Sequence, residues 1–394
     1  MMVPSSTAAP AAATLPLFLP QAPTDKVAGL IHAATLLAQL LGQGRAVDSR
    51  ALRSAMETAF CGTDAEGAWA WKDAYEALEA AQVLFPRKFG AAMRTRAGSA
   101  AAPGSSPGQA MLEMLTRLAA RLPSQTRRSE ESEQLQQFST PIPLGFAAAE
   151  AARLTPADLA LEPSAGTGLL AIFAELAKAR LALNEIADTR AGLLARLFRG
   201  LEVSRHNAEQ IHDRLHPAIR PSVLLMNPPF SASPHVERRF AEAAMHHISS
   251  ALGRLADGGR LVAITGRNTG PDQPAWREAF VRLQEKARVV FTAAVAGQAY
   301  ARHGTTIETR LTVIDRVPAE DPCTFPPSPG MAADAAELLG WISHLVPARQ
   351  AIAAPSLPIP PAMFPSRAAE SSGASACACQ TLGPRRRRAR LRNL

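Results

Sequence analysis

Short apolar runs alternate with amphipathic stretches between residues 158 and 317. The runs are continuous, as in strands buried on both faces of a parallel sheet. They predict strands at residues 159–162, 180–185, 201–204, 223–226, 259–265, 289–294 and 309–315. A stretch with apolar residues at helical spacing follows each of the first five runs, whereas none separates the last two. The pattern predicts a Rossmann-like, doubly wound α/β fold with a mostly parallel seven-stranded sheet and an antiparallel edge strand.

Other patterns lie outside this alternation. Residues 24–97 show helical spacing at 24–41, 49–60 and 69–84, which predicts a small helical N-terminal region; we identify no catalytic constellation in it. Residues 98–135 are expected to form a linker and one more helix, and residues 136–317 the α/β domain. Residues 1–23 predict a disordered leader. Residues 318–394, rich in Pro, Ala and Arg, predict a low-complexity tail with one further helical pattern at 334–345.

The charge of the chain is concentrated at its end. The formal net charge is +8, and Arg385–Arg388, Arg390 and Arg392 supply six of these charges, so that residues 1–384 carry +2. The four cysteines form no Cys-x-x-Cys pair, which indicates a reduced compartment and no zinc site. His212 and His216 have metal-ligand spacing without a third ligand. No apolar run reaches the roughly 20 residues that span a bilayer. We therefore expect a cytoplasmic protein without a metal or a membrane partner.

The strand at 223–226 ends in Asn227-Pro228-Pro229-Phe230. Two prolines prevent its continuation as helix or sheet interior. The amide oxygen of Asn227 and the carbonyl oxygen of Pro228 are hydrogen-bond acceptors, and the ring of Phe230 can stack on a planar group. This combination suits an exocyclic NH2 on an aromatic base. An ordinary loop after a strand is the alternative interpretation of these four residues.

A glycine-containing loop follows the first strand. It runs from Glu162 through Pro163, Ser164, Gly166 and Gly168 into a predicted helix. Glycines here permit a tight turn and let a ligand approach the backbone at a helix N-terminus. Glu185 ends the second strand, where an acidic side chain can accept ribose hydroxyl groups. A nicotinamide-dependent dehydrogenase could carry the same loop, so these residues alone leave the cofactor open.

These elements, in this order and preceded by Phe138-Ser-Thr140-Pro141, resemble the class I amino-methyltransferases, which methylate adenine N6 or similar planar amines with S-adenosylmethionine. The resemblance implies that the loop, with Thr140 and Pro141, holds the methionine part of the cofactor. It further implies that Glu185 holds the ribose and that Asn227, Pro228, Pro229 and Phe230 hold the acceptor amine. Asn207 stands where the family usually has an Asp that binds the adenine amine, which predicts weaker cofactor binding and an unchanged reaction.

A closer resemblance rests on residues 304–315. Within 136–317 the chain looks like bacterial and plasmid-borne proteins in which a methyltransferase precedes a strawberry-notch-like helicase. The chain contains no Gly-x-x-x-x-Gly-Lys-Ser/Thr phosphate loop, so we expect a truncated member that lacks the helicase. The subgroup implies DNA as the substrate, with RNA as a second candidate. Two alternatives stay open: a protein-glutamine N5 methyltransferase, because a side-chain amide is also planar, and a non-catalytic cofactor-binding remnant.

Overall fold

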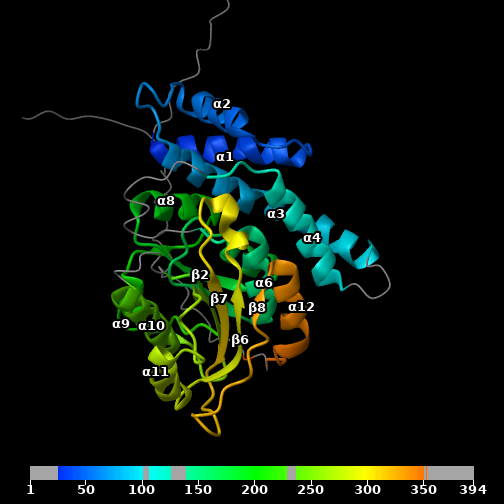
Figure 1. Ribbon diagram of the computed structural model, residues 1–394. Coiled ribbons are helices and arrows are strands. Elements are labelled where there is room, and N and C mark those ends of the chain that lie inside the picture. Colours follow the sequence, from blue (N-terminus) through cyan, green and yellow to red (C-terminus); the bar gives the residue numbers. More distant parts are fainter. Residues whose placement is uncertain (1–24, 101–105, 126–138, 229–236, 350–351, 353–394) are drawn as a thin grey trace, which may run out of the picture. The chain divides into compact units, whose positions relative to one another are not determined.

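A mixed sheet lies at the centre of the computed structural model, which describes residues 25–100, 106–125, 139–228, 237–349 and 352 (Figure 1). Its eight strands have the order β3-β2-β1-β4-β5-β7-β6-β8. The strand bounds are β1 Leu159–Glu162, β2 Arg180–Asn184, β3 Val203–Ser204, β4 Val223–Met226, β5 Arg260–Gly266, β6 Arg288–Val295, β7 Thr309–Asp315 and β8 Met331–Ala332. All described pairings are parallel except those of β7, which runs antiparallel to both β5 and β6. The predicted doubly wound, mostly parallel sheet is confirmed.

The sheet differs from the prediction at its edge. β8 is an additional strand that pairs parallel with β6. Helix α12 (Ala335–Leu345) follows it and buries Leu338, Leu339 and Ile342 in the main hydrophobic core. Helix α12 agrees with the helical pattern predicted at residues 334–345. Both elements nevertheless belong to the segment predicted as a low-complexity tail, so the boundary predicted at residue 317 is too early. Asp334 caps α12 by accepting hydrogen bonds from the N–H groups of Ala336 and Glu337.

Four helices precede the sheet. They are α1 (Lys26–Gly42), α2 (Ser49–Phe60), α3 (Trp71–Ala100) and α4 (Pro107–Ala120). Asp25 and Asp48 cap the first two through hydrogen bonds from the N–H groups of Ala28 and Ala51. The predicted helical region is thus present. Helix α3, however, continues through Pro86 and past the predicted end at residue 84 into the segment predicted as a linker, because Met93 and Ala97 extend its buried face.

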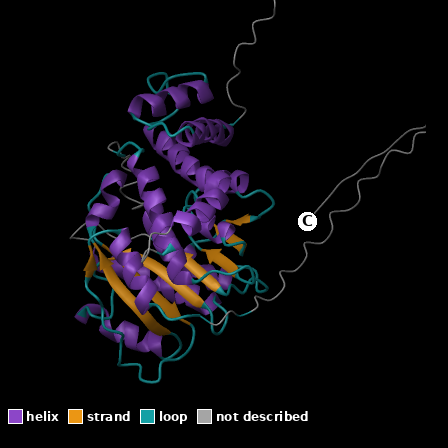
Figure 2. Cartoon of the chain, turned by 90° about the vertical axis from the view of Figure 1, so that its right-hand side faces the viewer, coloured by secondary structure: helices purple, strands orange, loops and turns teal. Residues whose placement is uncertain are grey.

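Helices cover both faces of the sheet (Figure 2). The larger core joins one face of the sheet to the four N-terminal helices, while a smaller core packs α10 and α11 against the other face. The remaining helices are α6 (Ile142–Ala152), α7 (Ala171–Leu176), α8 (Asp188–Leu197), α9 (Ile211–Arg214), α10 (Glu237–Arg254), α11 (Pro274–Gln284), and the 3-10 helices η1 (Ala208–Gln210) and η2 (Gly297–His303). In the part of the chain that the structure describes, none of the helices has the combined length and apolar character of a membrane span.

The N-terminal helices pack directly on α7 and α8. Arg87 of α3 forms a bidentate ion pair with Glu175 of α7, at 2.6 and 2.7 Å. Arg196 of α8 donates a hydrogen bond to Asp25 at the start of α1, at 2.6 Å. Glu76 and Glu79 of α3 also contact Arg190 in the first turn of α8 and Thr167 in the loop after β1, so the N-terminal helices reach the carboxyl ends of β1 and β2.

Candidate functional site

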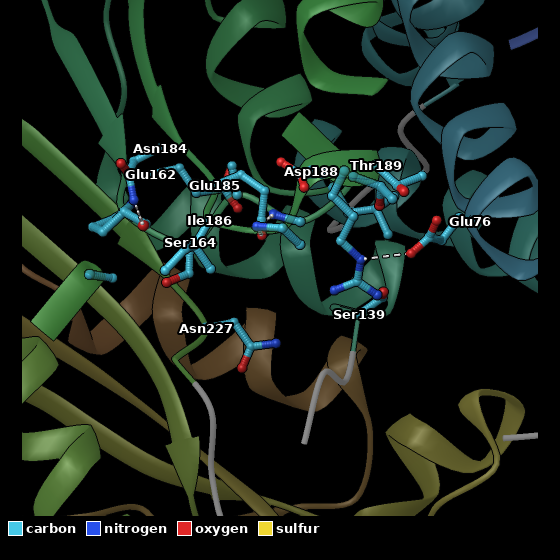
Figure 3. A pocket seen from close by; sticks show the side chains of 18 of the residues that line it. Glu76, Ser139, Glu162, Ser164, Asn184, Glu185, Ile186, Asp188, Thr189 and Asn227 are labelled. Carbon is cyan, nitrogen blue, oxygen red and sulfur yellow. Dashed lines mark hydrogen bonds and ion pairs between the residues drawn. The ribbon is translucent and has the colours of Figure 1, made fainter. Parts of the chain in front are cut away.

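A cavity of about 870 Å3 opens beside the carboxyl ends of β1, β2, β3 and β4. The strand order reverses between β1 and β4, and ligands of doubly wound proteins bind in the crevice at such a point. The volume lies within the range of small-molecule sites. Most of the residues predicted from sequence line this cavity, namely Thr140, Glu162, Pro163, Ser164, Gly166, Glu185, Asn207, Asn227 and Pro228. Figure 3 labels Glu162, Ser164, Glu185 and Asn227 among them.

Glu162 closes the glycine-containing loop. It is the last residue of β1, is buried, and accepts a hydrogen bond at 2.8 Å from the N–H of Ala171, the first residue of α7. Burial raises the pKa of Glu162 well above its ordinary value, and the nearby carboxylate of Glu185 raises it further, against the opposing hydrogen bond from Ala171. The side chain therefore holds the two ends of the loop together inside the protein.

The two glycines of the loop do different things. Both have a left-handed backbone, with φ of 55° at Gly166 and 90° at Gly168. A Cβ added at Gly166 would meet nothing within 4 Å, whereas one at Gly168 would lie 2.5 Å from the ring of Phe198. Gly166 thus leaves open space in the wall of the cavity. Gly168 does not line the cavity and instead permits close packing of the loop on the segment after α8.

Glu185 connects the loops that follow β1 and β2. Its carboxylate accepts hydrogen bonds from the N–H groups of Gly166 and Ala187, each at 2.8 Å. A carboxylate has about four acceptor positions, so both oxygens retain capacity for the hydroxyl groups of a ligand. The predicted position of an acidic side chain next to the glycine-containing loop is therefore present in the structure.

Asn184, next to Glu185, connects neighbouring loops of the site through its side chain, and sequence analysis did not select it. Its Nδ2 donates to the carbonyl oxygens of Pro163 and His206, each at 2.8 Å. Its Oδ1 accepts from the hydroxyl of Ser204 and the N–H of His206, each at 2.9 Å. One buried amide thereby ties together the loops after β1 and β3. An asparagine at the end of a buried strand, where nothing requires a turn, was the available signal.

Asn227 lies where β4 ends, as predicted. Its Nδ2 donates a hydrogen bond to Oγ1 of Thr140 at 3.0 Å, across 87 positions of sequence. The phenol of Tyr300, on η2, is completely buried beside it. Burial raises the pKa of Tyr300, and its hydrogen bond with Asn227 opposes this rise. The segment before α6 and the end of β4 therefore meet at the amide of Asn227. Phe138, Pro229 and Phe230 lie outside the described residues.

Asn207 and Pro141, two further predicted residues, lie away from the centre of this cavity. Asn207 is exposed at the cavity wall, and its Oδ1 accepts a hydrogen bond at 3.0 Å from the N–H of Glu209, which caps η1. Pro141 does not line this cavity. It lines a neighbouring cavity of about 750 Å3, whose wall includes residues of α3, α4 and η2 and the start of α12.

One wall of the first cavity comes from residues that sequence analysis did not select. Lys26 of α1 and Lys72, Asp73 and Glu76 of α3 line it, together with Arg190 from the first turn of α8. The Nε of Arg190 donates to Oε1 of Glu76 at 3.1 Å. The helical region, in which we had identified no catalytic constellation, therefore contributes charged groups to the candidate site.

No protein-family model matches the sequence, and no curated protein matches it either. Among solved structures, TrmN from Thermus thermophilus matches at 16% identity over 48% of this chain and 52% of that protein, with a TM-score of 0.35. A protein described as a modification subunit of a type I restriction enzyme from Vibrio vulnificus matches at 16% identity over 60% of this chain and 57% of that one, with a TM-score of 0.40.

A third match covers more of the chain. A protein described as a class I S-adenosylmethionine-dependent methyltransferase from Listeria monocytogenes matches at 10% identity over 82% of this chain and 98% of that protein, with a TM-score of 0.43. The chain spans only about half the length of the Thermus protein. With TM-scores below 0.5, these likenesses say nothing about the substrate of this chain.

Proposed function

We propose that the chain is an S-adenosylmethionine-dependent methyltransferase that acts on an exocyclic amine, with adenine N6 in DNA as the acceptor favoured by the sequence resemblance. The observation that supports this proposal best is the meeting of three elements at one cavity. These are the open position at Gly166, the carboxylate of Glu185, and the Asn227-Pro228 end of β4.

The residues present suit a nucleoside cofactor. The cavity has room for one, and the missing Cβ at Gly166 lets a ligand lie against the backbone. Glu185 offers acceptor capacity for a pair of sugar hydroxyl groups. Asn207 offers an amide at the cavity wall for the edge of a base. S-adenosylmethionine, when bound, supplies a methyl group already activated by the sulfonium.

The chain's part in the reaction is orientation and stabilisation. The bond to Thr140 uses an N–H of Asn227. The carbonyl oxygen Oδ1, which has two lone pairs, is the acceptor atom of this side chain and would accept an N–H of the amine. The carbonyl of Pro228 would accept the second N–H. Two acceptors hold the nitrogen in line with the methyl group and stabilise the positive charge that develops on it. No dedicated base is needed, because the alkylated nitrogen loses its proton readily.

Replacement of Asn227 tests this role. We expect Asn227→Ala to lower the single-turnover rate of methyl transfer roughly 100-fold or more, while cofactor affinity stays unchanged, because the lost bond matters most as charge develops. Asn268→Ala, at an exposed asparagine after β5, is the matched control and should react at the parental rate. An Asn227→Ala variant that methylates at the parental rate would remove the end of β4 from the active site.

The acceptor is identified by offering several at once. Labelled methyl groups should transfer to unmethylated DNA in preference to RNA or total protein. Transfer to protein alone would favour the glutamine methyltransferase, and cofactor binding without transfer to any acceptor would favour the non-catalytic remnant. A base in duplex DNA must leave the stack before it reacts. Phe230→Ala should then weaken binding of the acceptor by about 1–3 kcal/mol, the value of one stacked base, and Phe230→Tyr should be tolerated.

A further inference from the structure

Helix α3 carries polar side chains at every third position of its buried part. Asp73, Glu76, Glu79 and Gln82 are each at most 4% exposed. The residues between them, including Ala77, Ala80 and Ala81, are buried and apolar. At about 1.5 Å of rise per residue the stripe covers about 13 Å of the helix. Polar groups in such a position are costly unless they have partners, so the partners of each are informative.

Three of the four side chains have partners within the protein. Asp73 pairs with Lys26 at 2.7 Å and accepts from the N–H of Ala70. Glu79 accepts from the hydroxyl of Thr167 at 3.0 Å and from the amide of Gln125 at 3.4 Å, one bond to each oxygen. Gln82 donates to the carbonyl of Leu78. The polar groups of Asp73, Glu79 and Gln82 thus have hydrogen-bond or ion-pair partners within the protein and need no ligand.

Glu76 is different. Its Oε1 accepts from Arg190, but its Oε2 is buried and has no hydrogen-bond partner among the residues that the structure describes. Burial raises the pKa of Glu76, and the neighbouring Glu79 raises it further, against the effects of Arg190 and Lys72. Glu76 lines the first cavity. A buried carboxylate with one oxygen unpaired at a cavity wall is the arrangement expected where a ligand brings a cation.

We propose that Glu76, with Arg190, binds the amino-acid end of the cofactor: Oε2 of Glu76 accepts from its α-ammonium, and the guanidinium of Arg190 faces its α-carboxylate. This assignment rests on the proposed function. The guanidinium uses its Nε for Glu76 and has further donors on its two Nη atoms. A zwitterion placed here brings a positive charge to the carboxylate and a negative charge to the arginine, and Lys72, which also lines the cavity, adds to the attraction for the carboxylate.

The position of Glu76 agrees with this assignment. Glu79, three residues further along α3, contacts Thr167 in the glycine-containing loop, so Glu76 lies beside that loop. In the view of Figure 3, Ser139 and Thr189 lie between Glu76 and the side chains of Glu185 and Asn227, while Glu162 and Asn184 are at the opposite edge of the labelled set. The sugar and the reacting methyl group would thus have separate places from the amino-acid end.

The test pairs two variants of α3 with two ligands. S-adenosylhomocysteine carries the amino-acid end, and 5′-methylthioadenosine lacks it. By calorimetry on the full chain, we expect Glu76→Gln to bind S-adenosylhomocysteine at least tenfold more weakly than the parent and 5′-methylthioadenosine within about twofold of it. Glu79→Gln, at a satisfied carboxylate one turn away, is the matched control and should change the two affinities by the same factor.

A second measurement needs only the parent protein. The deaminated analogue of S-adenosylhomocysteine keeps the carboxylate and lacks the ammonium, and the parent should bind it at least tenfold more weakly than S-adenosylhomocysteine. If Glu76→Gln does not fold, this comparison still tests the contact with the ammonium on which the assignment depends. Two results would overturn the assignment and leave the proposed function intact. One is equal affinity of the parent for S-adenosylhomocysteine and its deaminated analogue. The other is an equal loss of affinity for S-adenosylhomocysteine and 5′-methylthioadenosine in Glu76→Gln. A parent that binds neither nucleoside would overturn both.

Discussion

Two walls of one cavity are built in different ways. The wall formed by the loops after β1 and β2 places its carboxylates, Glu162 and Glu185, on backbone N–H groups close by in sequence. The wall formed by α3 places Glu76 against Arg190, which is 114 positions away. The first wall is therefore a local property of the chain. The second exists only when the helical region packs on α8.

The largest expected loss of stability lies in the wall formed by the loops after β1 and β2. Gly168→Ala should lower the free energy of unfolding by about 2–5 kcal/mol, because a left-handed backbone and an overpacked contact with Phe198 both oppose the new methyl group. Gly166→Ala should cost only the backbone part, about 1–2 kcal/mol, and should weaken cofactor binding because its methyl group enters the cavity. Urea unfolding and calorimetry measure these changes. Equal stability of the two variants would contradict the packing assigned to Gly168.

Glu162→Gln should change the free energy of unfolding less than Gly168→Ala does. Glutamine keeps the shape of the side chain and an oxygen that accepts from the N–H of Ala171. The raised pKa of Glu162 means that the folded state binds this proton more tightly than the unfolded chain. The stability of the parent should therefore fall as pH rises from the ordinary value of 4.5 towards the raised value. Glu162→Gln should lose less stability than the parent as the pH rises above 4.5. Parallel thermal melts check this, and identical pH profiles would show that Glu162 titrates normally.

The smallest expected effect lies at the rim of the cavity. Asn207→Asp should tighten cofactor binding by about 1 kcal/mol, the usual margin of a charged over a neutral hydrogen bond. An aspartate can also accept from the N–H of Glu209, so η1 should keep its cap. Calorimetry measures the change. A weaker affinity would mean that residue 207 does not face the adenine.

The sheet was predictable because its signals are local. The continuous apolar runs give the bounds of β1, β4 and β7 as the structure has them. β8 was missed because two residues carry no periodic pattern, and α3 was ended too early because a proline usually stops a helix. The buried contacts of Met93 and Ala97 offset that cost.

The candidate site divides in the same way. Glu185 and Asn227 stand at strand ends, which sequence marks clearly, whereas the approach of Arg190 to Glu76 depends on tertiary packing. A signal for the α3 wall did exist. Polar residues at every third position of an Ala-rich helix, from Asp73 to Gln82, wind around the helix and indicate that it contacts polar groups inside the protein. The sequence could reveal the stripe but not its partners.

The common core of the N-terminal helices and the sheet has a practical consequence for dissecting the protein. Leu30, Leu37 and Leu78 belong to the same hydrophobic cluster as the strand residue Val223. A fragment that starts at the predicted boundary of residue 136 would expose the apolar surface of α7 and α8 to water and would remove one side of the cavity. Among the described residues, a fragment that keeps both the core and the cavity therefore has to include Asp25, the residue that caps α1 and binds Arg196 of α8.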